Sequence, residues 1–393
     1  MRCSIRFGNM FHYKFIHIIW CFLFYLSPLT LYGQRTISGR ITDADDGAPV
    51  PGVHVFIANT TVGTTTNADG YYQLKIPGEG SYQIAVSHVG YQPVFMEIEP
   101  GKASKVVDIE LQIYEMEGVE VALKIKARKQ DITLFWRTIL GENPSMKTIH
   151  AINSEAPYFY YNSKTEKLTV TCRTPLHIIN HEMGYHIQYE LNVFSHDYKT
   201  NISSWKAQCL FSELEPENDT QKRMWEEKRK QVYQVSIVHF IKTLYHNHSL
   251  WENGFLLIYP KYKPDYLISP DDYLSIDPVT QAKTFFIPED VLDPNDPYDV
   301  PIMLICFGQP ITYNDLQDIK YVKTVSRRWH EVGLFRSRLI MTEPVHIFPD
   351  GTSKNPILWI PMYSSSPLSG LNMTPPFDYD PDIVSDYIPD IIK

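Results

Sequence analysis

Two histidines and a glutamate stand close together in the segment Ile179–Leu191, INHEMGYHIQYEL. A zinc peptidase needs two histidines four residues apart, so that both project from one helical face beside a glutamate. His181 and His186 are five residues apart, which is about 140° around a helix. None of the fourteen histidines has a glutamate three residues later, the spacing of metallocarboxypeptidase ligands. We predict that neither His181 nor His186 holds a metal.

The local pattern around these histidines is that of a strand, not a helix. Gly184 marks a turn or bulge at its start, His181 belongs to the preceding loop, and His186 is expected to face solvent. Alternation of this kind is typical of a half-buried strand. The apolar set is Tyr185, Ile187, Tyr189, Leu191 and Val193, and the polar set is His186, Gln188, Glu190 and Asn192.

The clearest helical pattern covers residues 219–247, with Asp219 or Thr220 expected as the N-cap. Arg229 and His239 fall on or beside its apolar face. Two interpretations stay open: a satisfied polar group inside the core, with a carboxylate beside Arg229 and a hydrogen bond to His239, or a ligand site. The residues of this candidate ligand or buried polar site are Arg229, Tyr233, Ser236 and His239.

Other recognisable chemistry is absent from the sequence. No GxSxG nucleophile elbow, P-loop, dinucleotide-binding glycine pattern or four-cysteine metal cluster occurs. Cys172, Cys209 and Cys306 each lie within apolar patterns, which predicts small buried side chains. We therefore predict no catalytic, cofactor-binding or metal-binding residue, and expect no cofactor.

The first 33 residues resemble a secretory signal. Arg2, Arg6 and Lys14 precede the apolar run Phe15–Leu26, and cleavage is expected near Gly33. An uncleaved membrane anchor is the alternative, although the run is short for a span of about 20 residues. Removing three basic and no acidic residues takes the net charge from −9 to −12. Such an acidic surface argues against nucleic acid and anionic lipid as partners.

Residues 34–114 carry short alternating segments separated by turns such as Asp46-Gly47 and Asp69-Gly70. Strands at this spacing, with no helical stretch between them, predict an antiparallel β-sandwich. The segments SGRITDADDGAPVPGVHVFI, GTTTNADGYYQLKIP and VSHVGYQPV resemble the carboxypeptidase-regulatory-like domain, a transthyretin-like sandwich of seven strands. The resemblance implies a non-catalytic domain of the bacterial cell envelope, of the kind that precedes the plug of TonB-dependent receptors. Because the chain after residue 115 is short for a plug and a barrel, a receptor is not expected.

A charged connector is predicted at residues 115–130 and an α+β region at 131–393. Ile132, Phe135, Trp136 and Ile139 predict a helix that ends at Gly141. Residues 135–255 also resemble the C-terminal region of envelope proteins that have the regulatory-like domain and no assigned activity. Several strands are expected between residues 254 and 361, and a Pro- and Asp-rich tail at 363–393 is expected on the surface.

The expected fold is mainly β: a seven-stranded transthyretin-like sandwich, then an α+β region with one long amphipathic helix. The expected function is that of an exported, non-enzymatic envelope protein in the periplasm or at the outer membrane. It would bind an envelope protein or a glycan, and touch the membrane at most peripherally. The alternative is a hydrolase with dispersed catalytic carboxylates that acts on peptides or glycans.

Overall fold

The computed structural model describes residues 35–77, 80–99, 104–113, 127–141, 147–246, 248–258, 274–278, 282–286, 303–306, 335–340, 344–354, 358–361 and 375–381. The predicted signal at 1–33 and residues 115–126 of the predicted connector lie outside these residues. The described part is mainly β, with several small sheets and three helices. None of its helices is long and apolar enough to cross a membrane.

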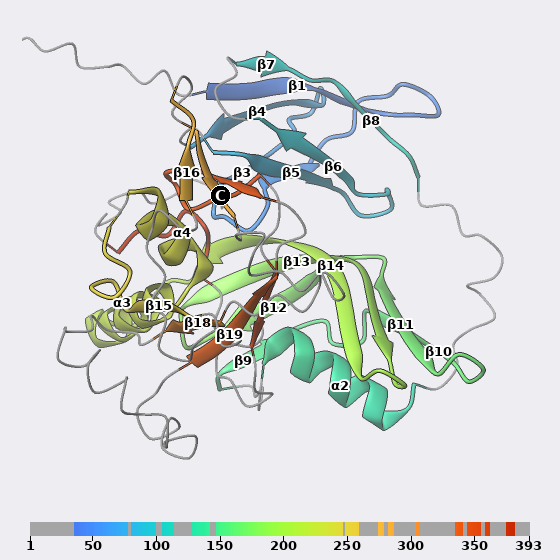
Figure 1. Cartoon of the computed structure of the whole chain (residues 1–393). Coiled ribbons are helices and arrows are strands. Elements are labelled where there is room, and N and C mark those ends of the chain that lie inside the picture. Colours follow the sequence, from blue (N-terminus) through green and yellow to red (C-terminus); the bar gives the residue numbers. More distant parts are fainter. Residues whose placement is uncertain are drawn as a thin grey trace, which may run out of the picture.

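Two four-stranded sheets form the N-terminal unit (Figure 1). In one, β1 pairs antiparallel with β4 and parallel with both β7 and β8. The other has the order β3-β2-β5-β6 and is antiparallel throughout. The strands are β1 (Arg35–Asp43), β2 (His54–Ile57), β3 (Gly63–Thr65), β4 (Tyr71–Ile76), β5 (Tyr82–Ser87), β6 (Val94–Ile98), β7 (Lys105–Val106) and β8 (Ile109–Leu111).

The sandwich has eight described strands rather than the predicted seven because the chain leaves the ladder between β7 and β8. At this interruption the carbonyl oxygen of Val107 accepts a hydrogen bond from the Tyr72 hydroxyl, and the Asp108 carboxylate accepts one from the Arg40 N–H. Gly39 permits the close approach, since a Cβ there would lie 1.9 Å from the Val107 oxygen. Two short pieces therefore lie beside the same strand, β1.

Apolar side chains from both sheets fill one core. The alternation predicted for this region is confirmed on β4, where Tyr72, Leu74 and Ile76 are buried in this core. A β-sandwich requires this sharing of a core between two sheets. Its buried members are Ile37, Ile41, Val50, Val53, Val55, Ile57, Tyr72, Leu74, Ile76, Tyr82, Ile84, Val86, Ile109 and Leu111.

A six-stranded antiparallel sheet forms the centre of the second unit. Its longest strand, β13, pairs with β14 on one side and with β12 and β11 in turn on the other. A β-bulge interrupts the β13–β14 register between Leu191 and Val193. The strands are β9 (Ile149–Ala151), β10 (Pro157–Asn162), β11 (Lys167–Cys172), β12 (Leu176–Asn180), β13 (Tyr185–Asp197) and β14 (Ile202–Glu213).

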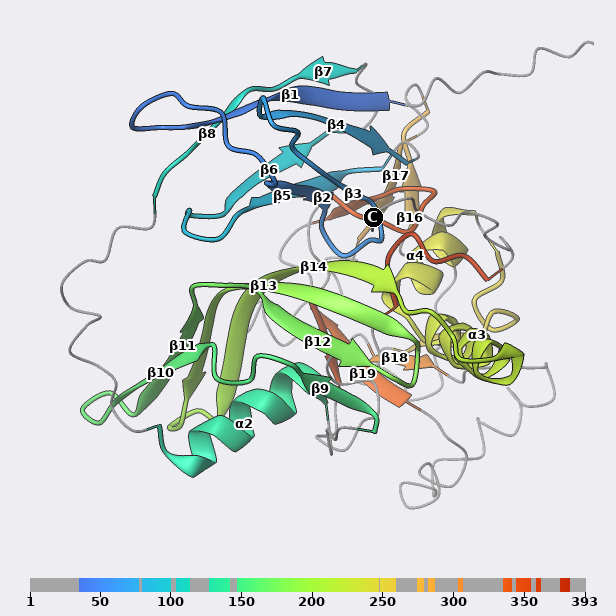
Figure 2. The same ribbon diagram turned by 180° about the vertical axis from the view of Figure 1, so that it is seen from behind.

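Helix α2 (Lys129–Leu140) covers one face of this sheet (Figure 2). Phe135 is fully buried and makes edge-on ring contacts with Phe159 and Phe194, at centroid distances of 5.5 and 5.3 Å. The helix ends at Gly141, whose φ of 98° suits a residue without a side chain. The predicted helix is thus confirmed, although it begins within the predicted connector.

The single long helix predicted over residues 219–247 was wrong. Two helices stand in its place, α3 (Asp219–Gln234) and α4 (Ile237–Tyr245). The extended backbone of Ser236 breaks the helix, and its side chain caps α4 by accepting a hydrogen bond from the His239 N–H at 3.2 Å. The apolar face continues across this break, so the periodicity alone does not reveal it.

The N-cap of α3 also differs from the prediction. Asn218, not Asp219 or Thr220, accepts a hydrogen bond from the N–H of Gln221 at 3.0 Å. Asn218 has the extended backbone of an N-cap residue, whereas Asp219 is already helical and lies in the first turn, where an acidic side chain is favoured by the helix dipole.

Seven short strands complete the described structure and confirm the strand content expected after residue 254. They form a four-stranded sheet, β15-β18-β19-β21, and a three-stranded sheet, β16-β17-β20. Their bounds are β15 (Phe255–Ile258), β16 (Leu274–Ile276), β17 (Lys283–Phe285), β18 (Met303–Cys306), β19 (Phe335–Ile340), β20 (Val345–Ile347) and β21 (Leu358–Pro361).

The described part of the predicted surface tail, residues 375–381, packs against both units. The Phe377 N–H donates to the Asn59 carbonyl at 2.8 Å, and the Asp378 carboxylate accepts hydrogen bonds from Thr61. On the other side, the Tyr379 ring lies 5.7 Å from that of Tyr233. This segment therefore joins the sandwich to helix α3.

The sandwich lies on the face of the six-stranded sheet opposite α2, as both views show (Figures 1 and 2). Backbone hydrogen bonds join the two units: Asn59 N–H to the Cys209 carbonyl at 2.6 Å, and Phe211 N–H to the Thr60 carbonyl at 2.9 Å. The amide of Gln208 donates to that of Gln83 at 2.9 Å. The two hydrophobic cores have no residue in common. The units are thus separate cores joined through a junction that contains several polar contacts.

Candidate functional site

The predicted site residue Arg229 clamps the turn between β12 and β13. Its guanidinium donates to the carbonyl oxygens of Met183 and Gly184 at 2.7 and 3.1 Å and pairs with the Glu213 carboxylate at 3.0 Å. It also lies 4.1 Å from the Tyr185 ring centroid, in cation–π contact. Arg229 is buried. Its donors are engaged by the protein, as a buried charge requires.

The other three predicted site residues meet where α3 gives way to α4. Ser236 caps α4, and the His239 ring lies 4.9 Å from the buried Tyr233 ring. The Nδ1 atom of His239 lies 3.1 Å from the Gln234 carbonyl oxygen. Burial lowers the pKa of His239, which favours its neutral form. The structure brings these residues together, with protein partners around them, and their use as a ligand site stays a prediction.

The segment from His181 to His186, which has the residue types of a zinc motif, forms a tight turn under α3. The Trp225 indole N–H donates to the His181 carbonyl at 2.8 Å, and the Asn180 side chain accepts the N–H of Met183 at 3.0 Å. Gly184 has a φ of 67°, and a Cβ on it would lie 2.2 Å from the Trp225 ring. The turn and its glycine were predicted correctly.

His181 and His186 have different partners. The His181 ring stacks on that of His150, whereas His186 stacks on His177. Among the described residues, no three His, Cys, Asp or Glu side chains form a group that could hold a metal ion.

The polar side of β13 does not face solvent, and that prediction was wrong. Gln188 and Glu190 are buried, and His186 is half-buried. The reason is tertiary: the outer face of the sandwich, carrying Ser87 and Gln83, covers this side of the sheet.

A cleft opens where this junction reaches the surface. It takes side chains from the loop after β5, from the β11–β12 connection and from the bulged part of β13. The sandwich contributes Ser87, His88, Tyr91 and Pro93, and the sheet contributes Cys172, Arg173, Thr174, Pro175, Glu190, Leu191 and Asn192. Surfaces of both units thus form one concave site, a common place for ligands.

Glu190 is the acidic group of the cleft and is only 7% exposed. Burial raises its pKa, while hydrogen bonds from Ser87 and from the Gln188 amide, the latter at 2.9 Å, act in the opposite direction. The bond from Ser87 crosses the junction. Glu190 therefore ties the two units together and gives the cleft a carboxyl group that holds a proton more strongly than an exposed one.

Hydrogen-bonding groups and an aromatic ring surround Glu190. The Asn192 Oδ1 atom is buried and accepts no hydrogen bond from the described residues. The Arg173 guanidinium lies 4.9 Å from the centroid of the exposed Tyr158 ring. The Tyr91 hydroxyl donates to Asp43 at 2.7 Å. The cleft wall thus contains a buried acceptor without a described donor, and a cation held on an aromatic ring.

Cys172 and Cys209 are free thiols on either side of this region. Cys209 is buried, as predicted, whereas Cys172 is half-buried and lines the cleft. Burial raises the pKa of Cys172 to about 12, and the thiol is protonated at neutral pH. The arrangement is not that of a cysteine nucleophile.

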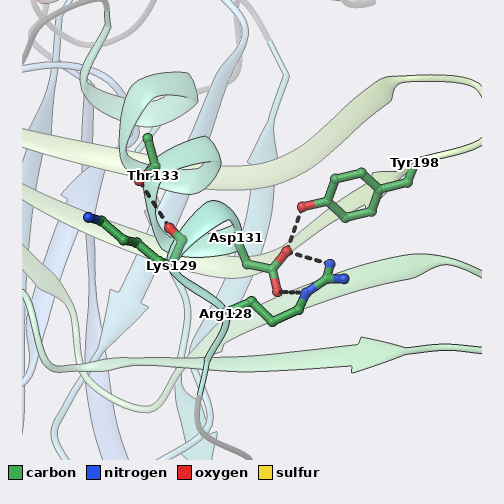
Figure 3. Close-up of polar contacts among 5 residues, drawn as sticks. All are labelled: Arg128, Lys129, Asp131, Thr133 and Tyr198. Atoms are coloured by element: carbon green, nitrogen blue, oxygen red, sulfur yellow. Dashed lines mark hydrogen bonds and ion pairs between the residues drawn. The ribbon is translucent and has the colours of Figure 1, made fainter.

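A second buried carboxylate, which the sequence did not reveal, lies at the start of α2 (Figure 3). Asp131 is 1% exposed and accepts two hydrogen bonds from Arg128, at 2.7 and 2.8 Å, and one from the Tyr198 hydroxyl at 2.5 Å. Arg128 in turn lies over the Tyr161 ring at 3.3 Å. These contacts anchor α2 to the β13–β14 turn, and the carboxylate has its partners.

Signals for both missed carboxylates are present in the sequence. Asp131 precedes Phe135 and Ile139 at intervals of four residues, which places a carboxylate on the apolar side of a helix. Glu190 belongs to the alternating polar set of β13. Such a set marks a polar face, but not what covers it.

Comparison with known proteins concerns mainly the sandwich. A family model described as a CarboxypepD_reg-like domain matches residues 37–121. Two TonB-dependent receptors of Formosa agariphila are similar: P3 is 25% identical over 117 residues and P39 is 36% identical over 83 residues. The matches cover 30% and 21% of this chain, and 11% and 7% of the receptors. The chain therefore spans a small part of the length of these relatives.

Solved structures give weaker likenesses. The Klebsiella pneumoniae 5-hydroxyisourate hydrolase is 18% identical, with 21% of this chain and 92% of that chain covered, at a TM-score of 0.18. A Bacteroides uniformis protein, provisionally described as carbohydrate-binding, is 12% identical, with 46% and 79% covered, at a TM-score of 0.17. Scores this low establish neither a shared fold nor a shared ligand. The family match is the informative one, and residues 37–121 of this chain are a CarboxypepD_reg-like domain, as in the distantly related TonB-dependent receptors.

Proposed function

We propose that the chain is an exported, non-enzymatic cell-envelope protein that binds its ligand in the cleft between its two units. In this proposal residues 1–33 are a signal, residues 34–114 are a transthyretin-like sandwich, residues 115–130 connect, and residues 131–393 form the α+β partner. Export and an envelope location are supported by the signal-like N-terminus and by the distant receptor relatives. The periplasm or the outer membrane is the proposed compartment.

The observation that carries the binding proposal is the cleft itself, because both units contribute to it. Ser87, His88 and Tyr91 stand opposite Arg173, Glu190 and Asn192. The side chains that converge on the cleft are mostly polar, which suits a ligand that forms hydrogen bonds. The hydrogen bond between Ser87 and Glu190 holds the two halves in register.

The lining favours a glycan over a protein partner. A sugar presents hydroxyl groups that accept hydrogen bonds from a guanidinium such as that of Arg173 and exchange them with a hydroxyl such as that of Thr174. The rings of Tyr91 and Tyr158 supply apolar faces beside these groups. The net charge of −9 disfavours a strongly acidic polymer, so a neutral glycan is the preferred ligand.

A hydrolase is the second candidate, and one observation favours it. Burial raises the pKa of Glu190, as expected of a general acid. Glycosidases, however, use two carboxyl groups, roughly 5 to 10 Å apart. Glu190 is the only carboxylate among the eleven described residues that line the cleft. The lining therefore supports binding better than hydrolysis.

The binding proposal is tested on the full mature chain with an array of neutral oligosaccharides, followed by titration calorimetry on the oligosaccharides that bind. Arg173→Ala should weaken binding at least tenfold. Arg40→Ala is a matched control, because Arg40 likewise lies over an exposed tyrosine, 5.5 Å from the Tyr71 ring, but outside the cleft. This control should bind like the wild type.

Three results would contradict the proposal. An equal loss of oligosaccharide affinity in Arg173→Ala and Arg40→Ala would mean that the cleft is not the binding site. Turnover of an oligosaccharide that Glu190→Gln abolishes would favour the hydrolase. Recovery of the chain from the cytosol with Met1 intact would exclude export.

A further inference from the structure

Two histidines on neighbouring strands share one hydrogen bond at the domain junction. His177 on β12 and His186 on β13 stack with ring centroids 5.3 Å apart and planes 13° apart. The Nδ1 atom of His177 lies 3.1 Å from the Nε2 atom of His186. One of these nitrogens must donate and the other accept. If both rings carried two protons, the bond would become a contact between two donors and two positive charges.

The sandwich brings further histidines to this pair. His54 on β2 is half-buried and interacts electrostatically with His177 and with His88. Its direct neighbour in the sheet is Ser87, which donates to Glu190 across the junction. We call His54, His177 and His186 the histidine cluster. It contains side chains from both units.

The titratable groups around the histidine cluster act in two directions. Burial lowers the pKa of His54, His177 and His186, and positive neighbours lower those of His54 and His186 further. His150, which faces His186 across Ile179 and stacks on His181, has a pKa that burial lowers in the same way. Glu190 acts in the opposite direction to the histidines. Burial raises its pKa and so favours its protonated form.

We propose that the histidine cluster makes docking of the sandwich on the six-stranded sheet dependent on pH, so that acid opens the junction. The geometry is the basis: His177 and His186 share a single proton on the sheet, and His54 lies beside Ser87 on the sandwich strand next to the junction. Opening would also separate the two halves of the cleft. The proposed pH dependence concerns docking of the two units and does not depend on the identity of any ligand.

The direction follows from proton uptake. A histidine whose pKa is lowered in the docked state favours docking fully above its free pKa of about 6.5, and loses this contribution as the pH falls through the docked value. Each proton taken up on opening raises the opening constant by up to about tenfold per pH unit. Glu190 works against this, since its raised pKa favours docking at low pH and loses that contribution as pH rises.

The experiment is amide hydrogen exchange on the full mature chain from pH 7.5 to 5.0, corrected for the intrinsic exchange rate. The amides of Asn59 and Phe211 report on the junction because they donate across it. The Ile57 amide, which donates to Val62 inside the sandwich, is the reference. Protection of the junction amides should fall more than tenfold relative to the reference over this range.

Variants distinguish pH-dependent docking through the histidine cluster from unfolding of the whole protein at low pH. His177→Gln and, independently, His54→Gln should flatten the pH dependence by up to about tenfold per pH unit. Glu190→Gln should steepen it. The control is His346→Gln, which alters an exposed histidine on β20 bonded to Thr284. It should follow the wild type.

Two results would overturn the proposal. In one, the junction amides lose protection in parallel with Ile57 at every pH. In the other, both His177→Gln and His54→Gln keep the wild-type slope. Failure of glycan binding would leave this test unaffected, because exchange reads docking directly.

Discussion

The two faces of the six-stranded sheet are covered in opposite ways. The face under α2 is apolar, with Phe135 packed among the rings of Phe159 and Phe194. The face under the sandwich is polar, with Gln188, Glu190 and Gln208 buried. One strand, β13, supplies both faces by alternation that shifts register at the bulge between Leu191 and Val193. A buried strand face can therefore be a core or an interface, and the side-chain chemistry tells the two apart.

This difference in chemistry predicts a difference in strength. Burial of apolar surface contributes roughly 25 cal/mol per Å², whereas a hydrogen bond exchanged for water contributes about 1 kcal/mol net. The α2 face should thus dominate stability. The polar face should set how the sandwich docks and how docking responds to conditions.

The largest effect is expected from Phe135→Ala. Removing this fully buried ring leaves a cavity under α2 and should lower the free energy of unfolding by about 3–5 kcal/mol. Ile132→Ala is the control, because Ile132 is exposed on the same helix. Urea denaturation measures both. A cost below that of Ile132→Ala would show that the α2 face is not the main core.

The next largest effect is expected at the turn that leads into β13. In Gly184→Ala the new methyl group would lie 2.2 Å from the Trp225 ring, at a φ of 67°. Backbone strain and overpacking together should cost about 2–4 kcal/mol. Gly47→Ala, at a φ of 72° with no atom within 4 Å of the added Cβ, should cost only about 1 kcal/mol. If Gly184→Ala and Gly47→Ala lose similar amounts of stability in thermal or urea unfolding, α3 does not pack tightly against this turn.

A pH-dependent effect of intermediate size is expected from Glu190→Gln. Since burial raises the pKa of Glu190, its contribution to stability is full below the free pKa near 4 and is lost as pH rises through the folded value. The variant should therefore gain on the wild type between pH 4 and pH 7, by roughly 1.4 kcal/mol for each unit of pKa shift. If the difference in unfolding free energy between Glu190→Gln and the wild type stays constant with pH, Glu190 is exposed to water and the prediction is contradicted.

The smallest effect is expected on the sandwich from removal of its partner. The two cores share no residue, and units of this size can fold alone. A fragment of residues 34–115 should unfold cooperatively on heating, and residues 131–393 should keep a β-rich circular dichroism signal. Fragments soluble only when co-expressed would show that the polar junction is part of a common core.

Local pattern was sufficient to predict the strands of the sandwich, helix α2 and the turn at Gly184. These features depend on neighbours within a few residues, such as the alternating Tyr72, Leu74 and Ile76. The break at Ser236 was missed because buried Val232 and Phe240 continue one apolar face across it. A helix cap of this kind is visible only when the backbone is known.

The junction was beyond local pattern because its contacts are distant in sequence. Thr60 bridges to Leu210, and Thr61 contacts Asp378. Polar alternation on β13 predicted a polar face correctly, but solvent and a hydrogen-bonding domain impose the same sequence pattern. For this reason His186 was assigned to solvent and the buried Glu190 on the same strand was missed, while Arg229 was predicted correctly to lie by an apolar helix face.

Docking of the sandwich on the polar face is tested most directly by a disulfide between Thr60→Cys and Leu210→Cys, which are β-bridge partners across the junction and therefore lie within disulfide range. The background carries Ala at Cys172, Cys209 and Cys306, and the control pairs Thr60→Cys with Ser204→Cys at the far, exposed part of β14. Under mild oxidation at neutral pH, the first pair should crosslink nearly completely within the monomer and the control pair should not. Equal crosslinking in both pairs, or none in the first, would contradict the docked arrangement.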